Sequence, residues 1–207
     1  MRTTLGIVTF ALVAIFVTPA LAGLDRSDAK RYGDSPAAVI TPQPDIRDAE
    51  EQHQRGLMYL KGDGVRKDDA AAFTWIRRAA EQGLPEAQAS LGFMYLKGYG
   101  VAPDQEQAVQ WFRKAAEHGS ASGQVNLGLA YVRGMGVARN YNEAVRWLRK
   151  AADQGDPPAQ YYLGIAYARG DGVVRNETEA LKWIRMAAEQ GDANAQHALQ
   201  ILGATPH

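Results

Sequence analysis

The side chains in this sequence that could carry out chemistry lack the spacing of a known catalytic or metal site. Four histidines are present, and none has the His-Glu-x-x-His spacing or a similar one that would hold a metal ion. Ser27 and Lys30 have the Ser-x-x-Lys spacing of penicillin-interacting enzymes, but the partner motifs of those enzymes are missing. The absence of cysteine excludes disulfides, thiol catalysis and cysteine-bound zinc. We therefore predict no cofactor, no metal site and no enzymatic activity.

Other residues, suited to binding rather than catalysis, recur every 36 positions. One column consists of large apolar residues, and a column of mixed residues precedes it by four positions. A cation follows the apolar column by four positions in every period. In that order, the three columns are Leu57, Phe93, Leu129 and Ile165; His53, Ala89, Val125, Tyr161 and His197; and Lys61, Lys97, Arg133 and Arg169. Such regular spacing requires a repeated element that presents each residue in the same way.

The repeated element has 36 residues and recurs without insertion from Ala49 onward. It gives four units, at 49–84, 85–120, 121–156 and 157–192, followed by a half unit at 193–207. A tyrosine, three glycine positions and a double alanine recur in every full unit, and so does a tryptophan, at Trp75, Trp111, Trp147 and Trp183. At this spacing we expect the tryptophans to form the core between repeats, because large aromatic rings bury much apolar surface.

Each unit is predicted to form two helices. In the second unit Ala87, Leu91 and Tyr95 are four residues apart and would share one face of a helix over 85–97. Apolar residues between 105 and 118 recur at spacings of three and four, which indicates the second helix. The paired glycines that follow the first helix are expected to end it, since glycine accepts left-handed backbone. A single hairpin cannot bury its apolar face, so the units must stack.

The start of each second helix carries a further signal. An N-cap residue is present in every unit, at Asp68, Asp104, Asn140 and Asn176. Capping-box residues follow three positions later in the last three units, at Gln107, Glu143 and Glu179. A column of arginines lies two positions after the tryptophans and is expected on the solvated flank of the second helix; its members are Arg77, Arg113, Arg149 and Arg185.

Together these residues resemble the Sel1-like repeat family, a relative of the tetratricopeptide repeat. The second unit carries the family pattern A-x-x-x-L-G-x-x-Y-x-x-G-x-G-V-x-x-D-x-x-x-A-x-x-W, followed by A-A-x-x-G, between Ala87 and Gly119. The resemblance covers Ala49 to about Leu202 and implies an all-α fold, a right-handed α/α solenoid of antiparallel helix pairs like the TPR superhelix. Arg55 replaces the leucine of the first unit, at the end of the array where a polar residue is expected. Gly123 replaces the first alanine of the third unit.

The resemblance also implies that the first helix of each pair lines a concave surface. The residues expected to bind a partner there are Leu57, Phe93, Val125, Leu129, Tyr161 and Ile165, with Lys61, Lys97, Arg133 and Arg169 beside them. Two interpretations of the four cations remain open. Each cation interacts favourably with the dipole at the end of its own helix, for about 0.3–1 kcal/mol. Alternatively, the four together orient an acidic peptide in an apolar groove.

The residues before the repeats are interpreted separately. Arg2, the apolar run from Leu5 to Val17 and the small residues from Ala20 to Ala22 form the three parts of a secretory signal peptide over 1–22. The apolar run is short for a membrane span, which needs about 20 residues. Residues 23–48 contain three prolines and no apolar period, and are predicted to form a flexible arm or tether. We therefore expect an exported protein, periplasmic or secreted, without stable membrane insertion after signal cleavage.

The balance of charges narrows the class of partner. The chain has 23 basic and 23 acidic residues, and the absence of a basic surplus argues against a nucleic-acid partner. We predict a non-catalytic adaptor or regulator that binds a protein or peptide through the concave face of the solenoid. The alternatives are an envelope enzyme that acts on β-lactams or peptidoglycan, a secreted host-interaction factor, and an array that self-associates.

Overall fold

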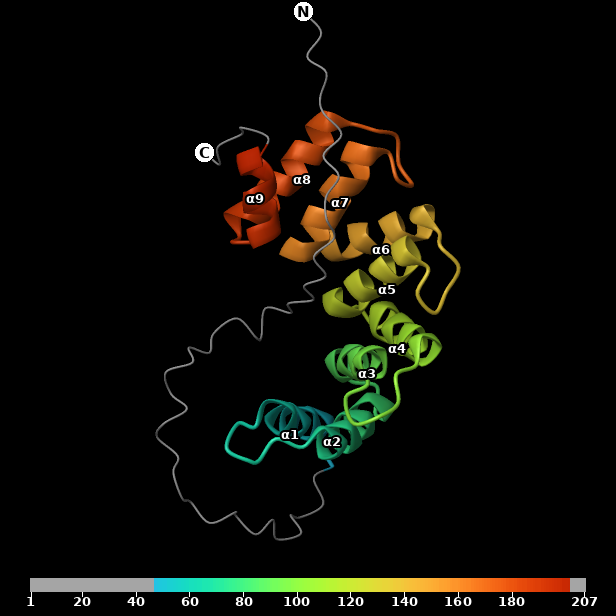
Figure 1. The fold of residues 1–207 in the computed structure, drawn as a ribbon, viewed down its shortest axis with the longest axis vertical. Helices are drawn as coiled ribbons and strands as arrows, with labels where there is room; N and C mark the ends of the chain where they lie inside the picture. Colours follow the sequence, from blue (N-terminus) through green and yellow to red (C-terminus); the bar gives the residue numbers. More distant parts are fainter. Residues whose placement is uncertain (1–46, 202–207) are drawn as a thin grey trace, which may run out of the picture. The chain divides into compact units, whose positions relative to one another are not determined.

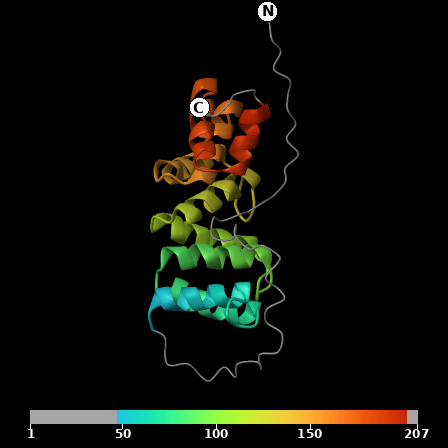
Figure 2. The same cartoon turned by 90° about the vertical axis from the view of Figure 1, so that its left-hand side faces the viewer.

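The computed structural model describes residues 47–201, and this part of the chain consists of α-helices joined by short connections, without a strand. The helices are α1 (Ala49–Lys61), α2 (Asp69–Glu81), α3 (Pro85–Lys97), α4 (Gln105–Glu117), α5 (Ala121–Arg133), α6 (Tyr141–Asp153), α7 (Pro157–Arg169), α8 (Glu177–Glu189) and α9 (Ala193–Ile201). Consecutive helices form antiparallel pairs, and the pairs stack on one another along a curve (Figures 1 and 2). The predicted all-α solenoid of helix pairs is confirmed. The signal peptide and most of the arm lie outside the described residues.

The boundaries of the helices follow from their capping residues. The odd-numbered helices α1, α3, α5 and α7, here called the first helices, end at glycines with φ between 69° and 78°. This left-handed conformation costs a residue with a Cβ more than it costs glycine. The even-numbered second helices begin at the predicted N-caps; the Asp104 carboxylate, for example, accepts hydrogen bonds from the backbone N–H groups of Glu106 and Gln107 at 3.0 Å.

The predicted capping boxes do not form. Their second half would require the residue at 107, 143 or 179 to accept a hydrogen bond from the N-cap backbone N–H. That N–H instead donates to the carbonyl of the repeated tyrosine in the preceding first helix, as from Asn140 to Tyr131 at 3.0 Å. Glu143 pairs with Arg146 at 3.4 Å on the surface of α6. The backbone hydrogen bond therefore ties the two helices of a unit together where the sequence pattern predicts a local cap.

Two kinds of glycine set the distances between helices. Within a unit, the glycine in the middle of the first helix faces the second helix, and a Cβ at Gly92 would lie 2.6 Å from the Phe112 ring. Between units, the second glycine of the connection contacts the preceding unit in the second, third and fourth units. A Cβ at Gly136 would overlap the backbone carbonyl of Gln105, the first residue of α4. The glycines therefore fix both the pairing within a unit and the stacking between units.

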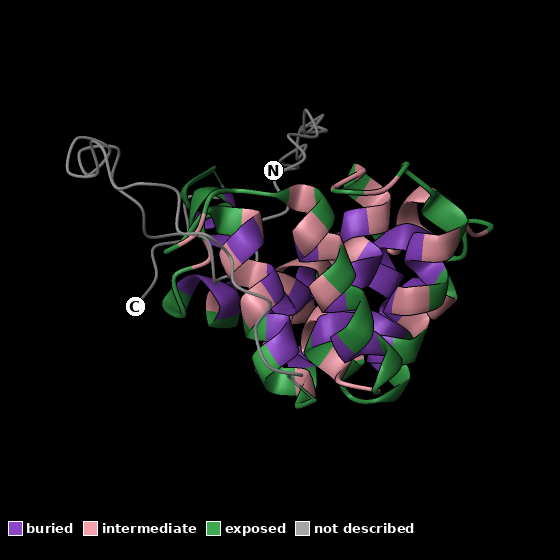
Figure 3. Cartoon of the chain, turned by 90° about the horizontal axis from the view of Figure 1, so that it is seen from below, coloured by how far each residue is buried: buried purple, intermediate pink, exposed green. Residues whose placement is uncertain are grey.

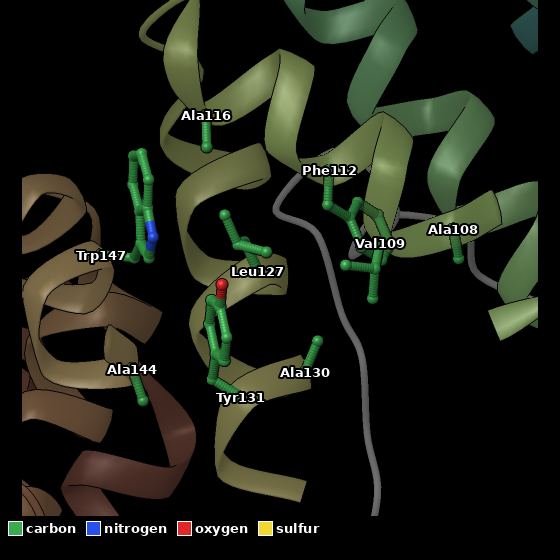
Figure 4. Packing of buried hydrophobic residues seen from close by; sticks show 9 residues of the cluster. All are labelled: Ala108, Val109, Phe112, Ala116, Leu127, Ala130, Tyr131, Ala144 and Trp147. Atoms are coloured by element: carbon green, nitrogen blue, oxygen red, sulfur yellow. The ribbon is translucent and has the colours of Figure 1, made fainter. Parts of the chain in front are cut away.

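The core runs along the array as a series of linked clusters. In the cluster between the second and third units, Leu127 and Tyr131 of α5 lie between Phe112 of α4 and Trp147 of α6 (Figure 4). Buried residues follow the inner contacts of every helix, and exposed residues form the outer surface and the connections (Figure 3). Trp147 and Trp183 are buried, whereas Trp75 and Trp111 are partly buried against the first cluster. The tryptophans thus belong to the core, as predicted, but to different degrees.

The first unit and α9 differ from the internal units at the positions that contact a neighbour. Arg55 takes the place of leucines that are fully buried in the following three units, such as Leu91. In α9, Leu199 is fully buried in the cluster with α8, but Gln200 occupies the position of the mid-helix glycine. Because a Cβ at that glycine meets the second helix, a helix like α8 could not pack on α9 in the same way.

Candidate protein-binding surface

The predicted partner-binding residues lie on one side of the first helices, here called the first-helix face. On α3 this face consists of Glu86, Ser90, Phe93 and Lys97, whose spacing of four, three and four places them in one row. In Figure 1, α1 and α3 lie on the inner side of the curve relative to α2 and α4. The equivalent residues of α1, α5 and α7 continue the row from one repeat to the next, as the common 36-residue period requires.

The apolar column is not a continuous exposed stripe. Leu57, Phe93 and Ile165 are half-buried, but Leu129 is only 3% exposed. In the neighbouring column Tyr161 is half-buried and Val125 is 8% exposed. The expectation of an open apolar surface along the whole face was therefore wrong at α5, where both predicted apolar residues are part of the core.

The position of α5 explains this burial. A Cβ at Gly123 would lie 2.5 Å from the Ala115 Cβ, so α5 lies closer to α4 than an alanine at this position would allow. Helix α5 also contacts α3 in addition to its neighbours α4 and α6. The departure of the third unit from the family pattern, Gly for Ala at residue 123, was the sequence signal for a more deeply buried helix.

The four predicted cations all lie in the last turn of their first helices. The side chains of Lys61, Lys97 and Arg169 are exposed and that of Arg133 is half-buried. Lys97 Nζ lies 5.8 Å from the centre of the Phe93 ring, within the range of a cation–π interaction. Their location fits a role at the helix dipole, and it also leaves three of the four charges accessible to a partner, so both interpretations stand.

A polar column lies between the two apolar ones and was missed in the sequence. It contains Gln54, Ser90, Asn126 and Tyr162, which share the 36-residue period but not a residue type. His53 Nε2 lies 2.9 Å from Ser90 Oγ, which links α1 to α3. Burial lowers the pKa of the His53 imidazole, and the nearby Glu86 carboxylate opposes this shift. On α7, burial raises the pKa of the Tyr162 hydroxyl, and the charge of Arg133 opposes it.

A second set of polar contacts joins the repeats through buried glutamines. Gln124 Nε2 donates to the Ala116 carbonyl of the preceding unit at 3.3 Å, and Gln124 Oε1 accepts from Gln154 of its own unit at 2.8 Å. The same arrangement recurs around Gln88 and Gln160, with His118 in place of the second glutamine at Gln88. Sequence reasoning overlooked this column because it followed apolar periodicity, although the glutamine is identical in every unit.

The arginine column is not simply a solvated flank. Arg113 donates to the Tyr131 hydroxyl at 3.0 Å, and Arg149 donates to the Tyr167 hydroxyl. Both arginines are half-buried and connect a second helix to the first helix of the next unit. Only Arg77 matches the expectation, since it is exposed and pairs with Glu81 at 3.4 Å. In the third and fourth units the repeated tyrosine is therefore a polar contact between units as well as a packing residue.

The described part of the chain offers no other recognisable functional site. Within residues 47–201 no group of three or more His, Asp or Glu side chains could hold a metal ion. None of the helices α1–α9 has the length and apolar character that a membrane crossing requires. The first-helix face, with half-buried apolar residues, a polar column and accessible cations, is therefore the surface that can be described as a binding site.

The fold and this face define an α/α repeat solenoid that presents a long surface built from equivalent helices. The chain belongs to the Sel1 repeat family, whose family model matches residues 52–84, 85–120, 121–156 and 157–192. Proteins of this family are generally non-catalytic scaffolds for protein–protein interaction. No curated protein gave a significant match to the chain.

Solved structures with the same architecture come from several bacteria. A Sel1 repeat protein from Oxalobacter formigenes is 38% identical, with a TM-score of 0.71 over 76% of this chain and 65% of that one. The c5321 protein, a protective antigen present in uropathogenic Escherichia coli strains, is 42% identical, with a TM-score of 0.69 over 77% of this chain and 35% of that one. The immunity protein Pa5087 from Pseudomonas aeruginosa is 25% identical, with a TM-score of 0.56 over 77% and 60%. The present chain thus spans less than two thirds of the length of each.

Proposed function

We propose that this protein is an exported, non-catalytic adaptor that binds a protein partner through its first-helix face. The observation that carries the proposal is the combination of half-buried apolar side chains with accessible cations in adjacent positions of successive repeats. Phe93 and Ile165 retain exposed surface on either side of the buried α5, and Lys97 and Arg169 lie one helical turn beyond them. Half-buried apolar groups ringed by charge are typical of surfaces that contact another protein.

Site-specific crosslinking tests where the partner binds. A photoreactive amino acid at Gln54, which is exposed on the first-helix face, is expected to form an adduct with a partner protein in intact cells. The same group at Gln110, which is exposed on the second helix α4, is expected to form none. Adducts from Gln110 in the absence of adducts from Gln54 would place the interface on the opposite side and contradict the proposal.

Substitution then tests which side chains hold the partner. Phe93→Ala together with Ile165→Ala is expected to reduce the Gln54 adduct about tenfold or more, because central aromatic and aliphatic contacts dominate binding energies. Met186→Ala is the matched control, since Met186 is an exposed apolar residue on the second helix α8. Circular dichroism of the variants confirms that the helices are intact.

Export is the second part of the proposal. The signal-peptide pattern over residues 1–22 supports it, and so does the similarity to a protein described as a protective antigen. We expect fractionation of cells that produce the full chain to yield a mature protein that starts at Gly23, outside the cytoplasm, with mass spectrometry of the N-terminal peptide as the measurement. Replacing the apolar run with a charged one should retain the protein in the cytoplasm. Unprocessed wild-type protein in the cytoplasm would contradict this part without affecting the proposed interface.

A further inference from the structure

The four cations of the first-helix face are not equivalent, because the residue two positions after each of them differs. In the first and fourth units this residue is acidic, Asp63 after Lys61 and Asp171 after Arg169. In the second and third units it is Tyr99 after Lys97 and Met135 after Arg133. Each of these residues lies between two glycines with positive φ, in the same turn of its unit. The backbone conformation of the turn is thus the same, and the side chain changes from acidic to aromatic or apolar.

The two central turns form one surface with the adjacent first helices. The Tyr99 ring packs edge-on against the Phe93 ring, with 6.0 Å between centroids, and Lys97 Nζ lies over the same Phe93 ring at 5.8 Å from its centroid. Helices α3 and α5 are in contact, so the Lys97 end of α3 and the Arg133 end of α5 belong to neighbouring first helices. Met135 and Tyr99 are both half-buried and therefore retain surface that a partner could cover.

The charges of the connections reinforce the difference at the third unit. Residues 133–140 contain Arg133 and Arg139 and no acidic residue, and the N-cap there is the neutral Asn140. The connections of the other units each contain at least one aspartate, namely Asp63 and Asp68, Asp104, and Asp171. The second and third units, at the centre of the array, therefore supply cations, an aromatic pair and a methionine. The connection of the third unit contains no acidic side chain.

From these observations we propose that Phe93, Lys97, Tyr99, Arg133 and Met135 form a central patch that binds a protein segment in which acidic and apolar side chains alternate. The proposal rests on the proposed function and narrows it from the whole first-helix face to its middle. An acidic side chain is attracted by the two cations, and the apolar neighbours of that side chain cover the exposed parts of the aromatic and methionine side chains. Lys61 and Arg169 would instead attract such a segment weakly, because the carboxylate two positions after each of them would repel the acidic side chains of the segment.

Two double variants with equal charge changes test this arrangement. The probe is a fluorescein-labelled synthetic peptide of alternating Glu and Leu, with a peptide of alternating Gln and Leu as its control, followed by fluorescence anisotropy. Lys97→Gln with Arg133→Gln is expected to weaken binding of the acidic peptide about tenfold. Lys61→Gln with Arg169→Gln removes the same charge from the same turn of two other helices and is expected to weaken binding less than about threefold. Both variants lose the same helix-dipole contribution, so the comparison isolates the central patch.

A second pair of substitutions tests the apolar part of the patch without changing a cation. Tyr99→Asp with Met135→Asp places in the central turns the residue that the end turns already contain, so the turns are expected to remain folded. This variant should abolish binding of the acidic peptide at low ionic strength, where the Debye length is about 30 Å, and at 0.1 M, where it is about 10 Å. Asp63→Asn with Asp171→Asn should leave the affinity at the central patch nearly unchanged.

The outcomes separate this inference from the proposed function. Equal losses in the two cation variants, equal binding of the acidic and neutral peptides, or no binding of the acidic peptide would overturn the central patch. Binding of the wild-type chain to vesicles of an anionic phospholipid with the same pattern of losses would also overturn it, in favour of a membrane surface. None of these results would change the crosslinking from Gln54, which tests the first-helix face as a whole.

Discussion

Gly136→Ala is expected to destabilise the protein by about 3 kcal/mol or more, and much more than the equivalent substitution in the first unit. Gly136 has a φ of 62°, and an alanine in this left-handed conformation costs about 1–2 kcal/mol. The new methyl group would also overlap the Gln105 carbonyl at the start of α4, and forcing extra atoms into a packed contact typically costs a further 1–3 kcal/mol. The overlap is with backbone, so no side-chain rotation relieves it.

Gly64→Ala provides the matched control. Gly64 has a φ of 67°, so its backbone strain is nearly the same, but a Cβ there meets only the flexible end of Met58 at an ordinary 3.7 Å. Unfolding by denaturant should therefore show a loss of about 1–2 kcal/mol for Gly64→Ala. Hydrogen exchange should locate the additional loss of Gly136→Ala in α4 and α5. Equal stabilities of the two variants would mean that the glycine of the connection does not determine the spacing between units.

Trp147→Ala should produce the second large effect, a loss of about 3–5 kcal/mol. Trp147 is 3% exposed and packs with Leu127 and Tyr131 in the cluster between the second and third units. Trp75→Ala is expected to cost less, because Trp75 is only partly buried. Since each repeat is stabilised mainly by its neighbours, the loss should appear as early unfolding of the units on both sides of α6.

Trp147→Phe separates packing from the polar part of the side chain. The buried indole nitrogen of Trp147 has no hydrogen-bond acceptor within residues 47–201. Phenylalanine keeps most of the apolar ring and removes this unsatisfied group, so its loss of stability should be well below that of alanine. Thermal and denaturant unfolding measure all three variants. If Trp147→Ala unfolded like the wild type, the repeat core would have to be held by other residues.

The sequence predicted the architecture well because each helix pair is specified by local signals that recur. Gly98 in the left-handed conformation and Asp104 at an N-cap are properties of short segments, and the 36-residue period repeats them in register. Contacts between units were harder to predict. The role of Arg113 depends on the hydroxyl of Tyr131, which lies 18 residues away in the next repeat, and a pattern of exposed and buried positions cannot show that pairing.

The candidate site could be predicted only as a set of columns, because the 36-residue period alone predicts the same burial for every residue of a column. Phe93 and Leu129 have the same register and similar apolar character, yet one is half-buried and the other belongs to the core. The difference comes from Gly123, a residue outside both columns that lets α5 approach α4 more closely. Burial on a repeat surface thus depends on how far each helix is inserted between its neighbours, which is a property of the stack.

The contacts of the glycines also bear on how such a gene can change in length. An internal unit packs on the preceding unit through a glycine such as Gly136 and through its buried leucine. The next unit in turn packs on the backbone at the start of the internal unit's second helix. A tandem duplication of 36 codons inside the second or third unit would therefore create a junction with contacts that already exist. A duplication that carried Arg55 or Gln200 into the interior would instead place a charge or an oversized side chain at a close contact. Because of this spacing, the array is expected to change in length by the gain or loss of whole internal repeats, while the first unit and α9 stay unchanged.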